Sequence, residues 1–132
     1  MKKMLKRLNK REGFTLAELL IVVAIIAVLV AISIPIFNNQ LEKAREATDA
    51  ANIRNAISDV TLQYLSADTP DATGYTATVT LTQKKNGWET APAFNDSKGN
   101  PITVASGTIP NEGGKADVTI ASDGSLSIKY YK

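Results

Sequence analysis

The chain has 132 residues, of which 44% are hydrophobic and 21% charged, and it contains neither cysteine nor histidine. These two absences exclude disulfides, thiolate or Ser–His nucleophiles and the usual zinc sites, so most classes of enzyme are disfavoured. The formal net charge of +2 is unevenly distributed. The first thirteen residues hold six of the fifteen basic side chains and one of the thirteen acidic ones, which leaves the remainder at −3.

The basic cluster at residues 2–11 precedes an apolar run, Leu19 to Phe37, that contains no charge. Nineteen helical residues span about 28 Å, close to the roughly 30 Å hydrocarbon core of a bilayer. A basic flank before such a run is typical of the cytoplasmic side of a membrane helix, so the C-terminal part is expected to lie across the membrane. The alternative is a nucleic-acid-binding leader.

The order of parts is unusual for a secretory signal. No small-residue cleavage site follows the run, whereas Gly13 precedes it. Between them lies Glu18, a single carboxylate at the head of the apolar segment, which is costly in lipid unless it is neutralised. The sequence therefore predicts that the apolar helix is retained after processing.

The segment Gly13-Phe14-Thr15-Leu16-Ala17-Glu18, with the apolar run that ends at Ile34-Pro35, resembles the N-terminal motif of type IV prepilins. The resemblance covers about the first 40 to 50 residues. It implies cleavage after Gly13 by a prepilin peptidase, N-methylation of Phe14, and assembly into a homo-oligomeric filament by a platform and ATPase machinery. In such a filament Glu18 of one subunit neutralises the Phe14 amine of the next. The alternative for Glu18 is a protonated or interface-seeking side chain without a specific role.

The resemblance implies a pilin fold, and the residues outside the motif predict the same α+β class. We expect four segments: a cleaved leader at 1–13, a transmembrane and polymerisation helix at 14–37, an amphipathic continuation at 38–66, and a β-sheet head at 67–132. Pro35 cannot donate a backbone hydrogen bond to the Ala31 carbonyl, so a helix kink is predicted there.

In the amphipathic part, three- to four-residue spacing predicts an inward-facing stripe and a wet face. The inward stripe is Leu41, Ala44, Thr48, Ala51, Ile53, Ile57, Val60 and Tyr64, and the wet face holds Glu42, Arg45 and Asp49.

The C-terminal half predicts an antiparallel sheet of about four strands. Alternation from Tyr75 to Thr82 indicates a strand, and Asn86-Gly87 suits a hairpin turn that leads to Trp88. Residues 102–104 form a possible short strand. A second hairpin pairs Val118 and Ile120 with Leu126, Ile128 and Tyr130 across Asp123-Gly124.

The head offers no catalytic residues, and neither a cofactor nor a metal is expected. Glu112, Asp117 and Asp123 are the carboxylates considered as ligands for a calcium ion. Acidic residues next to glycine are common in turns, however, and the spacing of these three is not that of an EF-hand.

The resemblance implies a pilus subunit, held in membrane lipid before assembly and then displayed on the cell surface, that serves adhesion, motility or DNA uptake. A pseudopilin of type II secretion and a competence pilin stay open, as does a single-pass membrane-anchored adhesin.

Overall fold

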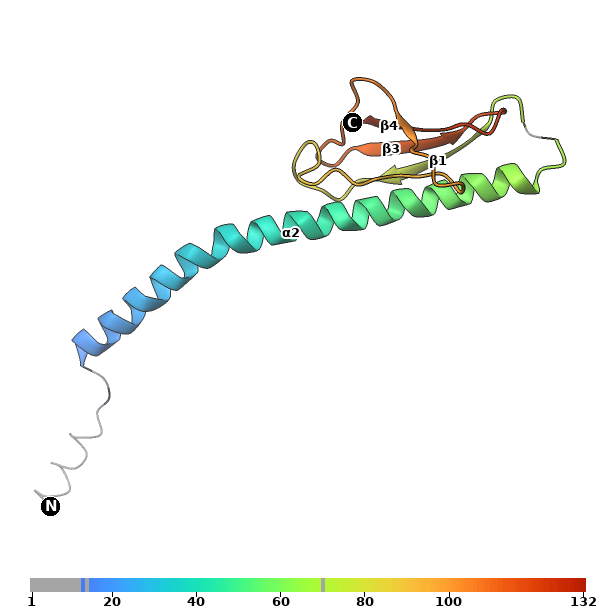
Figure 1. Cartoon of the computed structure of the whole chain (residues 1–132). Helices are drawn as coiled ribbons and strands as arrows, with labels where there is room; N and C mark the ends of the chain where they lie inside the picture. Colours follow the sequence, from blue (N-terminus) through green and yellow to red (C-terminus); the bar gives the residue numbers. More distant parts are fainter. Residues whose placement is uncertain (1–12, 14, 70) are drawn as a thin grey trace, which may run out of the picture. The chain divides into compact units, whose positions relative to one another are not determined.

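The computed structural model describes residues 13, 15–69 and 71–132. It contains helix α2 (Leu16–Ser66), followed by strands β1 (Tyr75–Thr80), β2 (Thr103–Val104), β3 (Lys115–Ile120) and β4 (Leu126–Tyr131) (Figure 1). The chain divides into two compact units between Asn39 and Gln40. The first unit is the apolar part of α2, and the second, hereafter the head, is the rest of α2 with the sheet.

The four strands form one sheet in the order β1-β3-β4-β2. The β3–β4 hairpin is antiparallel, with Val118 opposite Ile128 and Ile120 opposite Leu126, which confirms the hairpin predicted across Asp123-Gly124. Strand β2 pairs parallel with β4, so the sheet is mixed and the expectation of a wholly antiparallel sheet is wrong. The α+β class is confirmed.

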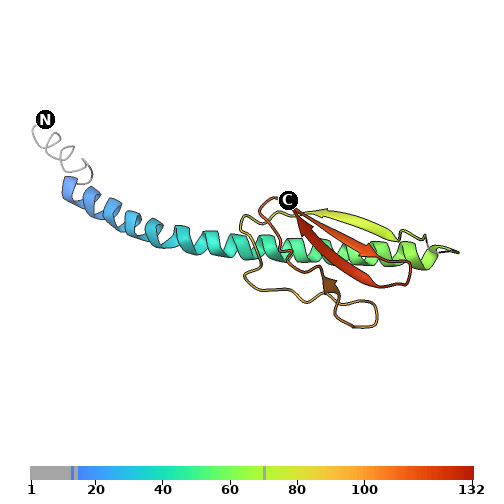
Figure 2. The ribbon, with the colours of Figure 1, turned by 90° about the horizontal axis from the view of Figure 1, so that it is seen from above.

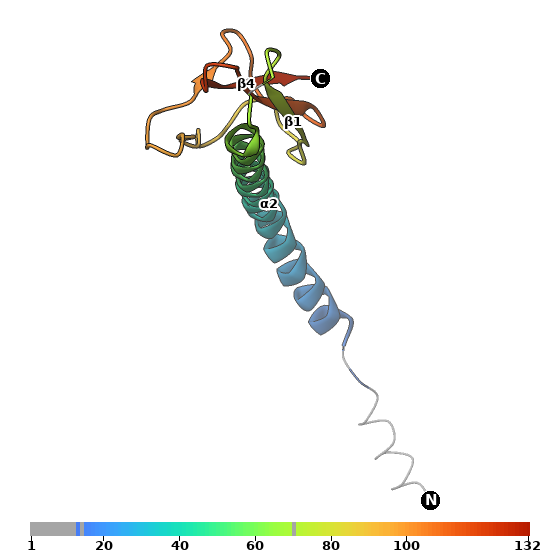
Figure 3. The same cartoon turned by 90° about the vertical axis from the view of Figure 1, so that its right-hand side faces the viewer.

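Within the head, the sheet lies along one side of α2 (Figures 2 and 3). Period-two alternation gives β3 and β4 one face toward the helix, and the aliphatic side chains of that face are buried. The helix contributes residues at three- and four-residue spacing. The fully buried members of this core are Ile53, Val60, Ala116, Val118 and Ile128.

The hairpin predicted at Asn86-Gly87 is wrong. In the part of the chain that the structure describes, no strand follows Gly87 until β2, and β1 pairs with β3 instead. The physical reason is that the backbone N–H groups just after β1 donate to side chains of α2 rather than to another strand.

The face of α2 that packs on the head also differs from the prediction. Ile53, Ile57 and Val60 are buried as expected, but Ala44, Thr48 and Ala51 are exposed. Glu42 and Asp49 are buried, 2% and 0% exposed, although both were expected on the wet side. Polar residues occupy these positions because the chain packed against them, residues 82–85, presents backbone N–H groups rather than apolar side chains. Buried N–H groups need hydrogen-bond acceptors.

One glycine is required by the packing. Gly74, just before β1, has a φ of 74°, and a side chain there would run into the Ile120 carbonyl oxygen. This close approach allows β1 to enter the sheet beside the end of β3.

Candidate assembly site and carboxylate cluster

The predicted processing and assembly residues lie at the start of α2. Gly13 is exposed, with a φ of 45°, and open space surrounds the position that a Cβ would occupy. Phe14 lies outside the described residues. Thr15 immediately precedes the helix, and its carbonyl accepts the first helical hydrogen bond, from Leu19 N–H at 3.2 Å.

Glu18 and Thr15 form a capping box. The Thr15 N–H donates to Glu18 Oε2 at 3.1 Å, and the Glu18 N–H donates to Thr15 Oγ1 at 3.2 Å. Two of the N–H groups left without partners at a helix N-terminus are thereby satisfied. Sequence reasoning missed this contact, although Thr-x-x-Glu ahead of an apolar run is its recognised signature. Pairing between Glu18 and Phe14 of a neighbouring subunit stays a prediction.

The part of the chain that the structure describes does not bury the apolar segment after Glu18. Helix α2 contains an 18-residue window of mean hydropathy 3.2 in which no residue is buried. Side chains such as Leu20, Ile21 and Phe37 are 59%, 60% and 64% exposed. Exposed apolar surface of this extent marks contact with lipid or with other protein.

Pro35 lies inside α2, which continues through it to Ser66. Two residues earlier, Ser33 Oγ donates to the Leu29 carbonyl at 2.6 Å, a hydrogen bond to the preceding turn that often bends helices. The kink at Pro35 itself stays a prediction.

The head holds a second group of interest, three buried carboxylates on one face of α2. Glu42, Glu46 and Asp49, hereafter the carboxylate cluster, are spaced by four and three residues and are 2%, 5% and 0% exposed. They face residues 82–89, which follow β1 and are hereafter the 82–89 segment.

The cluster accepts five backbone N–H groups from the 82–89 segment. Asp49 accepts from Thr82 at 2.8 Å and Gln83 at 2.9 Å. Glu42 accepts from both Lys84 and Lys85 at 2.8 Å. Glu46 accepts from Glu89 at 2.9 Å. Four consecutive amides therefore find their acceptors on a helix, an arrangement that no local sequence pattern indicates.

Hydrogen bonding and the neighbouring guanidinium determine the direction in which the pKa of Glu42 is shifted. Burial raises the pKa of its carboxyl, but the N–H groups of Lys84 and Lys85 and the adjacent Arg45 guanidinium, 3.3 Å away, together hold that pKa below its ordinary value. An ionised carboxylate with two amide donors is a strong acceptor. The cluster thus fastens the segment to α2 chiefly through anions bonded to backbone.

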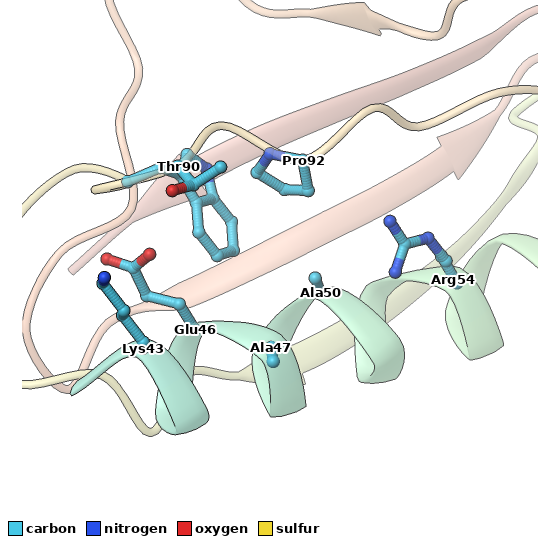
Figure 4. A pocket seen from close by; sticks show the side chains of 8 residues that line it. Lys43, Glu46, Ala47, Ala50, Arg54, Thr90 and Pro92 are labelled. Atoms are coloured by element: carbon cyan, nitrogen blue, oxygen red, sulfur yellow. The ribbon is translucent and has the colours of Figure 1, made fainter. Parts of the chain in front are cut away.

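A shallow groove lies between this part of α2 and the chain after the segment. It encloses about 340 Å³, and Figure 4 shows Lys43 and Glu46 at one end and Arg54 at the other. The Arg54 guanidinium lies 5.6 Å from the centre of the Phe94 ring and donates to the Ala93 carbonyl at 3.4 Å. Lys43 and Arg54 line the groove together with the carboxylate of Glu46, so the groove has no single charge sign.

The head carboxylates considered for calcium have other partners. Asp117 accepts from Thr78 Oγ1 at 2.7 Å and from the Tyr131 hydroxyl at 3.0 Å. Asp123 accepts from both the N–H and the hydroxyl of Ser125 within its turn. Among residues 13, 15–69 and 71–132, no three acidic side chains are grouped so as to hold a metal ion.

Comparison with known proteins finds one family model and several relatives that each match part of the chain. Residues 8–34 match the family model described as the prokaryotic N-terminal methylation motif. The chain is 41% identical over 68 residues to "Prepilin peptidase-dependent protein D" of Escherichia coli, which covers 48% of this chain and 46% of that protein. It is 40% identical over 65 residues to "Type IV narrow pilus major component PilA5" of Thermus thermophilus, covering 47% and 56% of the two chains.

A third relative, "Type IV major fimbrial protein FimA" of Dichelobacter nodosus, is 42% identical over 61 residues, 44% of this chain and 38% of that one. The chain thus spans about half the length of the curated relatives that it matches, or less. No solved structure matches it.

One long helix packed on a four-stranded sheet is an α+β arrangement, and the chain carries the prokaryotic N-terminal methylation motif at residues 8–34. The partial matches to a type IV pilus component, a type IV fimbrial protein and a prepilin peptidase-dependent protein confirm the resemblance to type IV pilins drawn from residues 13–18.

Proposed function

We propose that the chain is a structural subunit of a type IV pilus, cleaved after Gly13, N-methylated at Phe14 and polymerised through α2. The observation that carries this proposal is the uncovered apolar window of α2, together with the methylation motif matched over residues 8–34, which contains Glu18. Before assembly, lipid covers that surface, with the N-terminus in the cytoplasm and the head outside. In the filament, helices of other copies cover it.

The head supports the proposal with a further helix surface. The exposed stripe, defined as the α2 positions that recur every three or four residues on the side away from the sheet, mixes leucines with small side chains. It comprises Leu41, Ala44, Thr48, Ala51, Asn55, Ser58, Leu62 and Leu65. This is a heptad-like repeat, and small residues allow two helix backbones to approach closely.

The partners that follow are a prepilin peptidase, an assembly platform with its ATPase, and further copies of the chain. The product is a filament on the cell surface that serves adhesion, motility or DNA uptake. The chain's part is structural, because the described head brings together hydrogen-bonded turns and a packed core rather than an acid–base pair.

Intact mass tests the proposal. Filaments sheared from cells should contain this chain beginning at Phe14 with one added methyl group, and cells that lack the chain should lose the filament. If the chain stays in the membrane fraction with residues 1–13 attached while the peptidase processes another prepilin, it is a tethered domain and not a pilus subunit.

A further inference from the structure

The carboxylate cluster has a consequence beyond filament assembly. We propose that the carboxylate cluster forms an acid-operated latch, which holds the 82–89 segment on α2 and opens when Glu42, bonded to two backbone N–H groups of the segment and to Arg45, takes up a proton. Release separates the segment from the helix while β3 and β4 remain paired. The latch lies within the head and does not require the chain to polymerise.

The strength of the hydrogen bonds to the segment depends on the protonation state of the accepting carboxyl group. Glu42 receives two N–H groups on one oxygen, Oε1, and Asp49 receives three donors on two oxygens, from Thr82 N–H, Thr82 Oγ1 and Gln83 N–H. A protonated carboxyl becomes a donor at one oxygen and a weaker acceptor at the other. Protonation therefore weakens several bonds to the segment at once.

Few charges offset the cluster. From α2, Arg45 bonds Glu42 at 3.3 Å, and Lys43 lies beside Glu46 (Figure 4). From the segment, Lys85 pairs with Glu89 at 2.9 Å and is also attracted by Glu42 and Glu46. Lys84 contributes its backbone amide and is exposed.

From the sheet, the Tyr130 ring packs against Trp88, and from the turn before β3 the Glu112 N–H donates to the Asn86 side chain at 2.9 Å. Burial raises the pKa of the Tyr130 hydroxyl, so it stays neutral throughout the acid range. Three buried carboxylates thus share one close guanidinium and accept five backbone N–H groups.

The pH window follows from Glu42. Its pKa is lowered in the folded head from an ordinary value of 4.5, so its ionised form favours the latched state. That contribution is fully present above the unfolded value and is lost as the pH falls below about 4.5 through the folded value. The latch is therefore closed at neutral pH and opens in acid.

The segment carries its own reporter. Trp88 is the only tryptophan in the chain and is half-buried, with ring centres 6.4 Å from Phe94 and 6.2 Å from Tyr130. Opening removes Trp88 from these rings and exposes it to water. Trp88 fluorescence consequently follows the segment, while far-ultraviolet circular dichroism follows α2 and the sheet.

The experiment is an acid titration of the full chain in detergent micelles from pH 7 to pH 3. We expect Trp88 emission to move to longer wavelength at a pH where the dichroism is unchanged, and amide hydrogen exchange of residues 82–85 to accelerate before that of β3 and β4. The logarithm of the opening constant, plotted against pH, has a slope equal to the number of protons taken up, about tenfold per pH unit for each proton.

An isosteric variant tests this assignment. Glu42→Gln keeps an acceptor oxygen but has no carboxyl group to protonate, so it should lower the slope by about one. Asp59→Asn is the matched control, because Asp59 is exposed on the same helix and lies outside the cluster, and it should keep the wild-type slope.

Two results would overturn the latch. One is a Trp88 transition that coincides with loss of the dichroism, which would mean that the segment has no opening of its own. The other is a slope that persists unchanged in Glu42→Gln. If Glu42→Gln does not fold, the order of amide hydrogen exchange in the wild-type chain decides the question.

Discussion

Asp49 Oδ1 accepts both the backbone N–H and the hydroxyl of Thr82 at 2.8 Å, across 33 residues of sequence. Its second oxygen accepts the Gln83 N–H at 2.9 Å, and the aspartate is 0% exposed. One helix side chain thus replaces the strand that would otherwise pair with the chain after β1.

Replacing Asp49 with alanine should destabilise the head by roughly 2 to 4 kcal/mol, because two buried N–H groups lose a charged acceptor. Urea unfolding of the full chain in detergent, followed by Trp88 fluorescence at pH 7, measures the change. Asp59→Ala is the matched control, since Asp59 is exposed on the same helix, and it should change stability by no more than about 0.5 kcal/mol. Equal effects at both positions would show that the bonds to Thr82 and Gln83 contribute nothing.

Gly74→Ala should be more damaging than Gly107→Ala, although both glycines have a positive φ, 74° and 76°. At Gly107 an added Cβ meets nothing within 4 Å, so only backbone strain of about 1 kcal/mol is expected. At Gly74 the Cβ also meets the Ile120 carbonyl, so β1 must shift away from the end of β3. Thermal unfolding of the two variants tests this, and a similar loss in both would contradict the steric part of the argument.

The elements that the sequence predicted well are those with local determinants. The β3–β4 hairpin needs only alternation and the Asp123-Gly124 turn, and the hairpin was predicted correctly. Helix α2 was predicted from the length and composition of the segment that forms it and from the helix-breaking residues 68–70 that follow. Strand β2 is different, because a two-residue parallel pairing with β4 depends on how a long loop returns to the sheet.

The carboxylate cluster escaped prediction for a related reason. Glu42 and Asp49 have the spacing of a solvated helix face, and only the position of the 82–89 segment turns that face inward. Conversely, the small residues Ala44 and Ala51 seemed suited to a core and are instead exposed. Periodicity identified a two-sided helix, but the partner of each side depends on residues more than thirty positions away.

The exposed stripe yields a prediction about assembly. Ala51→Glu should leave the unfolding free energy of the head nearly unchanged, because Ala51 is exposed, yet should abolish filaments if another helix packs there. Gln63→Glu adds the same charge at another exposed α2 position outside the stripe and should assemble normally. Electron microscopy of sheared filaments gives the readout, and wild-type filaments from Ala51→Glu would remove the stripe from the interface.

Glu18 now has two candidate roles, which three variants separate. Its carboxylate accepts the Thr15 N–H within the chain, and the proposed filament has it neutralise the Phe14 amine of a neighbour. Glu18→Gln keeps an acceptor for the Thr15 N–H and removes the charge. Thr15→Ala removes a capping hydroxyl worth about 1 kcal/mol and keeps the charge. Glu18→Ala removes both the acceptor for the Thr15 N–H and the charge. If the charge pairs with Phe14, Glu18→Gln and Glu18→Ala should be cleaved after Gly13 but fail to assemble or to be methylated, whereas Thr15→Ala should assemble. Mass spectrometry of the N-terminus and filament counts measure both steps. Normal methylated filaments from Glu18→Gln, with none from Glu18→Ala, would instead assign Glu18 to the helix cap.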